Sequence, residues 1–264
     1  MIAVPAGIGG GTLFVPIVGS LFPFHLDFVR GAGLLAALAS ALSAAPTLLR
    51  GGMGSLRLAL PLALLASLGS IAGAYLGLKL PAPVVQTLLG ATVLGIVALM
   101  LGTDTARPSA PPRRDDALGR RLGLAGTFHD HAAGLEVAWQ ARRTGPALAL
   151  FGAIGVLGGM FGIGAGWANV PALNLFMGLP LKVAAGTSTL VLAMSSSTAA
   201  WVYLGQGAVL PVIAVPTVAG MMLGARVGVR LLMVLHGAAI HRVVVGVLLF
   251  AGLRALFQGL RLWH

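Results

Sequence analysis

Two glycine-rich motifs are the first candidates for chemistry, because their backbone could bind a ligand directly. The first is Gly7-Ile8-Gly9-Gly10-Gly11, followed by Pro16, and the second is Gly162-Ile163-Gly164-Ala165-Gly166, followed by Pro171. Each glycine costs roughly 1 kcal/mol relative to alanine inside a helix, so such a cluster favours a break in the backbone. The N–H groups freed at a break can face an anion. The alternative is a close helix crossing lined by glycine.

Hydroxyl side chains follow the second motif. Ala185-Gly186-Thr187-Ser188-Thr189 comes shortly after Lys182, and Ser195-Ser196-Ser197-Thr198 follows. If a helix starts here, Thr187 and Ser188 offer hydroxyl and amide donors to an oxyanion at its N-terminus. Such side chains in membrane helices also bond back to their own backbone or join helices, and this alternative stays open for both clusters. Trp167 and Asn169 either line a pocket or pack between helices.

The candidate substrate site combines both glycine motifs with these donors. An anion with several acceptor oxygens suits a set of modest N–H and O–H donors, whereas one buried lysine would hold it too tightly for release. The predicted substrate-binding residues are Gly9, Gly10, Gly11, Gly164, Gly166, Asn169, Thr187 and Ser188.

The segments that must position these residues are strongly apolar. Of the 264 residues, 58% are hydrophobic and only 9% are charged, and the mean hydropathy is +0.97. Soluble chains carry roughly 25% charged residues. The composition therefore predicts an all-α, polytopic membrane protein embedded in the lipid bilayer, with about eight transmembrane segments. These apolar segments are 1–22, 31–49, 58–79, 83–102, 146–178, 183–204, 208–232 and 239–258.

A constant offset of 155 residues relates two halves of the chain, since it places the first glycine motif on the second and Pro16 on Pro171. We expect a first transmembrane repeat at 1–102 and a second at 146–264, joined by a charged, proline-containing aqueous linker at 103–145 with a small β-hairpin. Internal duplication is typical of secondary transporters. Because 146–178 is too long for one crossing, it must break, tilt or re-enter.

The charges disfavour several other functions. The net charge is +11, but the arginines flank apolar segments and form no aromatic-interleaved patch, so we expect no nucleic-acid partner. Five of the six carboxylates fall in the linker and Asp27 lies between the first two segments, which disfavours a cation permease. His129-Asp130-His131 is expected to be a solvated loop, and the chain has no cysteine, so no metal or cofactor is predicted.

The positive-inside rule predicts the orientation of the chain. If eight segments each cross once, the linker side collects 11 of the 17 basic residues. The linker and both termini would then face the cytoplasm. Parallel and inverted repeats both remain open.

The run from Gly158 to Leu192 resembles the TauE/SafE family of membrane anion exporters. The likeness lies in the second glycine motif, in Val170-Pro171-Ala172-Leu173-Asn174 and in Gly178-Leu179-Pro180-Leu181-Lys182 through Gly186-Thr187-Ser188, and continues through Tyr203-Leu204-x-x-Gly207 and Leu223-Gly224-Ala225-Arg226-Val227-Gly228. The first half is similar but weaker.

This resemblance implies a non-enzymatic transporter that exports sulfite, sulfoacetate or related organosulfonates across the bacterial inner membrane, driven by the proton motive force. Two departures are the short apolar lead-in before the first glycine motif, as if the start were truncated or internal, and Ala165 in place of a glycine. The alternatives are a permease for another small anion, such as a carboxylate, and a non-transporting membrane scaffold or assembly factor.

Overall fold

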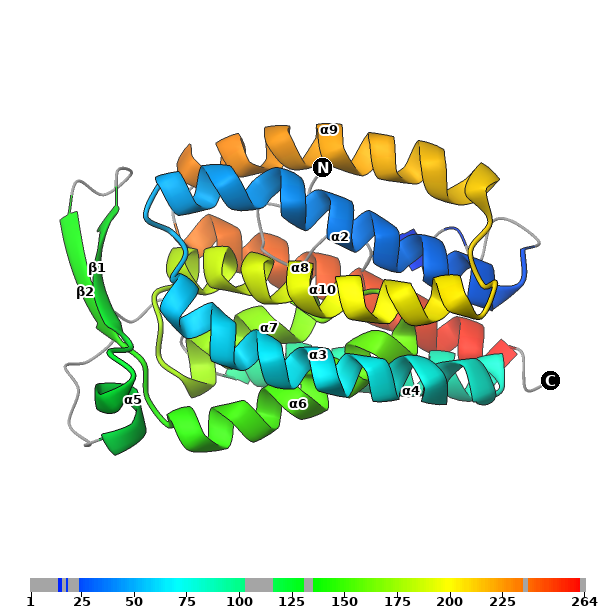
Figure 1. The fold of residues 1–264 in the computed structure, drawn as a ribbon, viewed down its shortest axis with the longest axis horizontal. Coiled ribbons are helices and arrows are strands. Elements are labelled where there is room, and N and C mark those ends of the chain that lie inside the picture. Colours follow the sequence, from blue (N-terminus) through cyan, green and yellow to red (C-terminus); the bar gives the residue numbers. More distant parts are fainter. Residues whose placement is uncertain are drawn as a thin grey trace.

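The computed structural model of the chain describes residues 14, 15, 18, 24–102, 116–130, 135–234 and 237–261. Long helices lie side by side along the longest axis of the molecule (Figure 1). The helices of the first half are α2 (Leu26–Arg50), α3 (Leu56–Lys79) and α4 (Ala82–Gly102). The remaining elements are α5 (Ala117–Arg121), β1 (Ala125–Asp130), β2 (Leu135–Gln140), α6 (Thr144–Phe161), α7 (Gly166–Pro171), the π-helical turn η1 (Ala172–Phe176), α8 (Leu181–Gly205), α9 (Pro211–Val234) and α10 (Gly237–Arg261).

The prediction of an all-α membrane protein is confirmed. Four described helical segments are long and apolar enough to cross a bilayer, namely Leu26–Arg50, Leu56–Lys79, Thr144–Phe161 and Pro211–Arg230. Leucines and other large apolar side chains are exposed along Leu56–Lys79 and Pro211–Arg230, as lipid contact requires. The number of about eight transmembrane segments stays a prediction.

A small polar structure lies at one end of the helices, which we call the hairpin end (Figure 1). Strands β1 and β2 pair antiparallel, from Ala125 opposite Gln140 to Asp130 opposite Leu135. The short helix α5 begins beside them, and the Asp116 carboxylate caps it by accepting the N–H of Gly119 at 3.1 Å. The same carboxylate accepts the N–H of Thr144 at 2.7 Å, which ties the linker to the start of α6.

We expect the replacement of Asp116 by alanine to lower the free energy of unfolding by roughly 1 to 2 kcal/mol, because both caps are lost. Burial by itself would raise the pKa of Asp116, but the hydrogen bonds from Thr144 and Gly119 outweigh it and leave this pKa below its ordinary value. The stabilisation is therefore full at neutral pH and is lost as the pH falls through the lowered pKa. Unfolding in detergent at neutral and acidic pH tests this, and equal stability of both proteins at neutral pH would contradict it.

The two halves share their helix boundaries. Helix α2 (Leu26–Arg50) and helix α8 (Leu181–Gly205) differ by 155 residues at both ends, and so do α3 (Leu56–Lys79) and α9 (Pro211–Val234). This is the offset that relates the two glycine motifs in the sequence.

Equivalent helices run in opposite directions. Gly54, just after α2, lies against Gly186 near the start of α8, whereas Gly31 near the start of α2 lies against Ala208 just after α8. Helices α2 and α8 are therefore antiparallel, although each is the counterpart of the other. Equivalent helices with opposite directions correspond to an inverted rather than a parallel arrangement of the halves, whereas the sequence alone allowed both.

The helices of the two halves pack against one another and do not form two separate groups. Helix α2 packs mainly against α8 and α9, and α3 against α6 and α8. The Ser70 hydroxyl on α3 donates to the carbonyl of Ser195 on α8 at 2.8 Å. Helix α8 thus lies between helices of the first half, where it can line a path shared by both.

Small residues allow α3 and α6 to approach closely. Gly69, Gly73 and Gly77 on α3 lie against the backbone of Gly152, Val156 and Met160 on α6. This spacing of four residues forms one glycine stripe, and the matching order shows that the two helices run parallel. Because lipid provides no hydrophobic drive for helix association, such close backbone packing holds membrane helices together.

Candidate functional site

The second glycine motif interrupts a helix inside the bundle. Helix α6 ends where Gly162 has a φ of +70°, Gly164 has a φ of +71°, and α7 begins at Gly166. A side chain would strain both positive-φ positions, which explains the glycines there. The prediction of a broken helix is therefore confirmed for this motif.

After the break the chain returns to the end from which it came. The N–H of Arg142, before α6, donates to the carbonyl of Met177, after η1, at 3.1 Å. The segment from α6 to η1 thus enters and leaves at the hairpin end. This re-entrant path changes the expected topology, since α8 then starts at the hairpin end instead of the opposite one.

We expected both termini to lie on the side of the linker. For the C-terminal helix α10 this is wrong, because it ends at the end opposite the hairpin. Helix α10 reaches Gly259 beside Thr87, near the start of α4, and α4 begins just after Lys79 at the end opposite the hairpin. The first terminus, residues 1–13, lies outside the described residues.

The break lies where both halves meet. A Cβ on Gly164 would contact Leu192 and Ser196 on α8 and Ala37 on α2, all near the middle of their helices. A Cβ added to Gly33 on α2 would lie 2.6 Å from both the Gly162 carbonyl oxygen and a methyl group of Val15 in the first half. The predicted residues Gly9, Gly10 and Gly11 are outside the described residues, but Val15, four positions later, lies close to the second break.

Several polar side chains near the break are buried without a hydrogen-bond partner. Asn169 on α7 is 0% exposed, and neither its Nδ2 nor its Oδ1 has a partner. The Trp167 Nε1 and the Ser196 Oγ are likewise buried and unpaired. A buried amide without partners costs several kcal/mol, so natural proteins rarely keep one unless a ligand or water pairs with it.

Thr187 and Ser188 are buried within α8, but the prediction that they open a helix is wrong. Helix α8 begins at Leu181, because Pro180 fixes an extended backbone just before it. Their N–H groups therefore belong to the helix interior. The Thr187 Oγ1 accepts the N–H of Ser55 at 3.3 Å, near the hairpin end, so these two side chains lie further toward that end than Gly164.

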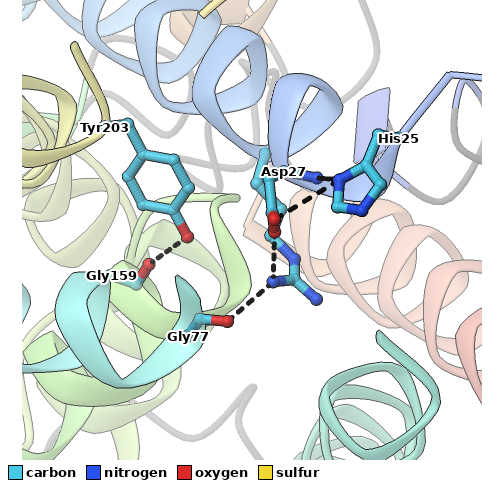
Figure 2. A network of polar contacts seen from close by, with 6 residues as sticks. His25, Asp27, Gly77, Gly159 and Tyr203 are labelled. Atoms are coloured by element: carbon cyan, nitrogen blue, oxygen red, sulfur yellow. Dashed lines mark hydrogen bonds and ion pairs between the residues drawn. The ribbon is translucent and has the colours of Figure 1, made fainter. Parts of the chain in front are cut away.

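Figure 2 shows a polar network that the sequence did not indicate as part of the site. Its residues Asp27 and Arg30, near the start of α2, and Gly77, near the end of α3, lie toward the end opposite the hairpin. The Arg30 Nη1 donates to the Asp27 Oδ1 at 3.0 Å and to the carbonyl of Gly77 at 2.9 Å. The Tyr203 hydroxyl donates to the carbonyl of Gly159 at 3.2 Å. Arg30 is only 1% exposed and packs directly against Gly162. The flanking small residues Gly31, Ala32 and Gly33 were the sequence signal for its burial.

Within the described residues there is no group of three or more His, Asp or Glu side chains that could hold a metal ion. The buried polar side chains described around the break carry amide, indole, hydroxyl and guanidinium groups, all of which can donate hydrogen bonds to an anion.

Equivalent helices that run in opposite directions, with a broken helix where they meet, are typical of membrane transporters. The chain belongs to the sulfite exporter TauE/SafE family, whose model matches residues 1–255, and the resemblance seen in the sequence is thereby confirmed. It is also 30% identical over 138 residues to the probable membrane transporter protein YunE of Bacillus subtilis (strain 168). That match covers 52% of this chain and 50% of the relative, so the chain spans about half the length of the relative it matches. No solved structure matches the chain significantly.

Proposed function

We propose that the protein exports sulfite, sulfoacetate or related small organosulfonates across the bacterial cytoplasmic membrane, driven by the proton motive force. The transporter class follows from the family, and the anion and its coupling are the proposal. The observation that carries it is the unpaired, fully buried Asn169 beside the Gly162–Gly166 break.

A sulfonate offers three acceptor oxygens with a shared charge. The amide of Asn169 and the hydroxyl of Ser196 provide donors whose hydrogen bonds are unmade in the structure. Glycines at the break let a ligand approach the backbone closely. We therefore keep Gly164, Gly166 and Asn169 in the proposed site, and Gly9, Gly10 and Gly11, which are outside the described residues, stay part of the prediction.

Thr187 and Ser188 lie outside the proposed site at the break. They are buried on α8 closer to the hairpin end, in the same part of the helix as the buried Lys182. We propose that they line the approach to the site from the hairpin end.

The charges support an anion rather than a cation as cargo. Among the long described helices, Asp27 is the single carboxylate residue, and it already pairs with Arg30. Buried carboxylates commonly bind ions or relay protons in cation-coupled pumps. The buried hydrogen-bond donors near the break, and the pairing of the Asp27 carboxylate with Arg30, therefore favour an anion.

We propose that the hairpin end, with the linker 103–145 between the repeats 1–102 and 146–264, faces the cytoplasm. Of the 14 lysines and arginines in the described part of the chain, ten lie nearer the hairpin end by their place on the helices and loops. Arg30, Lys79, Arg254 and Arg261 lie nearer the other end. The re-entrant path thus gives the asymmetry that the positive-inside rule associates with a cytoplasmic face.

Labelling of single introduced cysteines can test this orientation, because the chain has no native cysteine that would also react. Thr127 on β1 and Gln206 after α8 are both exposed and lie at opposite ends. We expect a membrane-impermeant maleimide to label Gln206→Cys but not Thr127→Cys in intact spheroplasts, and to label both after lysis. Labelling of Thr127→Cys alone in intact spheroplasts would reverse the proposed orientation.

Binding by the purified protein tests the proposed substrate class. In detergent, sulfite and sulfoacetate are expected to raise the unfolding temperature, as ligands that bind the folded state do, while equal concentrations of acetate and chloride raise it less. An equal or larger effect of acetate would indicate a carboxylate permease. No effect of any anion would favour a scaffold.

A further inference from the structure

The guanidinium of Arg30 lies close to the Tyr203 side chain and has a nitrogen that is buried without a hydrogen-bond partner. Its Nη1 is satisfied by the carboxylate of Asp27 and the carbonyl of Gly77, whereas its Nη2 is buried without a partner. The side chain is 1% exposed and lies on a helix long and apolar enough to span the bilayer. An arginine in such a place is costly and marks a functional site more often than a structural one.

Its carboxylate partner is open to water. The Asp27 side chain is 25% exposed, and its second oxygen lies 3.3 Å from the Nδ1 of His25, which is 70% exposed. The ion pair therefore joins a buried cation to an anion that water and solutes can reach. Another anion from solution could replace such a partner without leaving the guanidinium uncompensated.

The repeat provides an internal comparison. The position equivalent to Arg30 in the second half is Ala185, which is fully buried on α8. Lys182 occupies the position equivalent to Asp27. Equivalent glycines of the two helices make equivalent contacts, Gly31 with Ala208 and Gly186 with Met53, so the packing of α2 and α8 at these points does not require an arginine.

The surroundings connect Arg30 to the broken helix. A Cβ on Gly162 would collide with the Cα, Cβ and Cγ atoms of Arg30, so the end of α6 rests on the arginine side chain. Arg30 also holds the end of α3 through Gly77. An anion that leaves the break toward the end opposite the hairpin meets this guanidinium.

We propose that Arg30 is a second anion-binding site, at the release end of the path, where the Nη2 binds one oxyanion oxygen and the substrate competes with the carboxylate of Asp27 for the Nη1. Planar N–H donors of arginine match the oxygens of sulfonate or sulfite. This inference rests on the proposed function, because it assigns a second contact to the same transported anion.

The test is the concentration dependence of sulfoacetate flux in proteoliposomes, for the wild type and four variants. Arg30→Lys keeps the charge but loses the second N–H group, and we expect its KM to rise at least about tenfold with the folded yield retained. Asp27→Asn removes the competing anion, so its KM is expected to fall. Lys79→Gln removes an exposed cation at the same end and is expected to behave as the wild type.

The double variant Arg30→Gln with Asp27→Asn separates binding from structure. It removes both charges together and leaves no buried ion unpaired, so it is expected to fold. A purely structural ion pair predicts wild-type flux in this variant, and that result would overturn the proposal. We expect its KM to stay raised at least about tenfold. If the wild type itself carried no sulfoacetate or sulfite, the proposed function would fail first, and the inference with it.

Discussion

Replacing Asn169 by leucine is expected to abolish saturable sulfonate transport at low substrate and, at the same time, to stabilise the protein. The amide is fully buried and both of its polar atoms lack partners. Removing it relieves a desolvation penalty of roughly 1 to 3 kcal/mol, while the anion loses a donor worth a similar amount. Sulfoacetate affinity and unfolding in detergent measure the two effects, and we expect at least about a tenfold loss of affinity.

Asn174 is the matched control for this prediction. It lies in η1, shortly after α7, but its Nδ2 donates to the carbonyl of Leu179 at 2.8 Å. Its replacement by leucine is expected to lower stability by about 1 kcal/mol and to leave anion affinity nearly unchanged. Opposite signs of stability change at two asparagines five positions apart would be hard to obtain from packing alone. A loss of stability in Asn169→Leu with unchanged affinity would show that Asn169 is structural.

Replacing Gly73 by valine is expected to prevent assembly of the bundle. A side chain there would collide with the backbone of Val156 on α6, which cannot move aside as a flexible side chain could. Overpacking typically costs 1 to 3 kcal/mol, and here the parallel pair of α3 and α6 must separate, so the cost is at or above that range. Gly95→Val on α4 is the control, because nothing lies within 4 Å of its added Cβ. Size-exclusion chromatography should recover the control and not Gly73→Val, and equal recovery would contradict the packing.

The sequence indicated two features: a helix break at the second glycine motif and an offset of 155 residues between the halves. Three glycines in five residues indicated a break, and at this break Gly162 and Gly164 have a positive φ, a backbone that glycine adopts without strain. The offset between glycine motifs also matched the helix boundaries of α2 and α8. Both features depend on local backbone chemistry, which one sequence can show.

The relative direction of the two halves and the role of Arg30 could not be predicted from the sequence alone. Whether α2 and α8 are parallel depends on contacts such as Gly31 with Ala208, far apart in the chain. The sequence suggested an apolar segment from residue 31, but α2 begins at Leu26, where the His25 side chain accepts the N–H of Asp27. This added turn places Arg30 inside the bundle. Similarly, Pro180 starts α8 early and puts Thr187 in its interior.

The most direct test of the account is flux through the purified protein in liposomes, with sulfite, sulfoacetate, acetate and chloride, each with and without a pH gradient. We expect saturable flux of sulfite or sulfoacetate that exceeds the flux of acetate and chloride. The pH gradient is expected to drive this flux, and Asn169→Leu is expected to remove it. Flux equal to that of protein-free liposomes for both sulfur anions, or undiminished flux through Asn169→Leu, would contradict a sulfonate carrier with its site at the Gly162–Gly166 break.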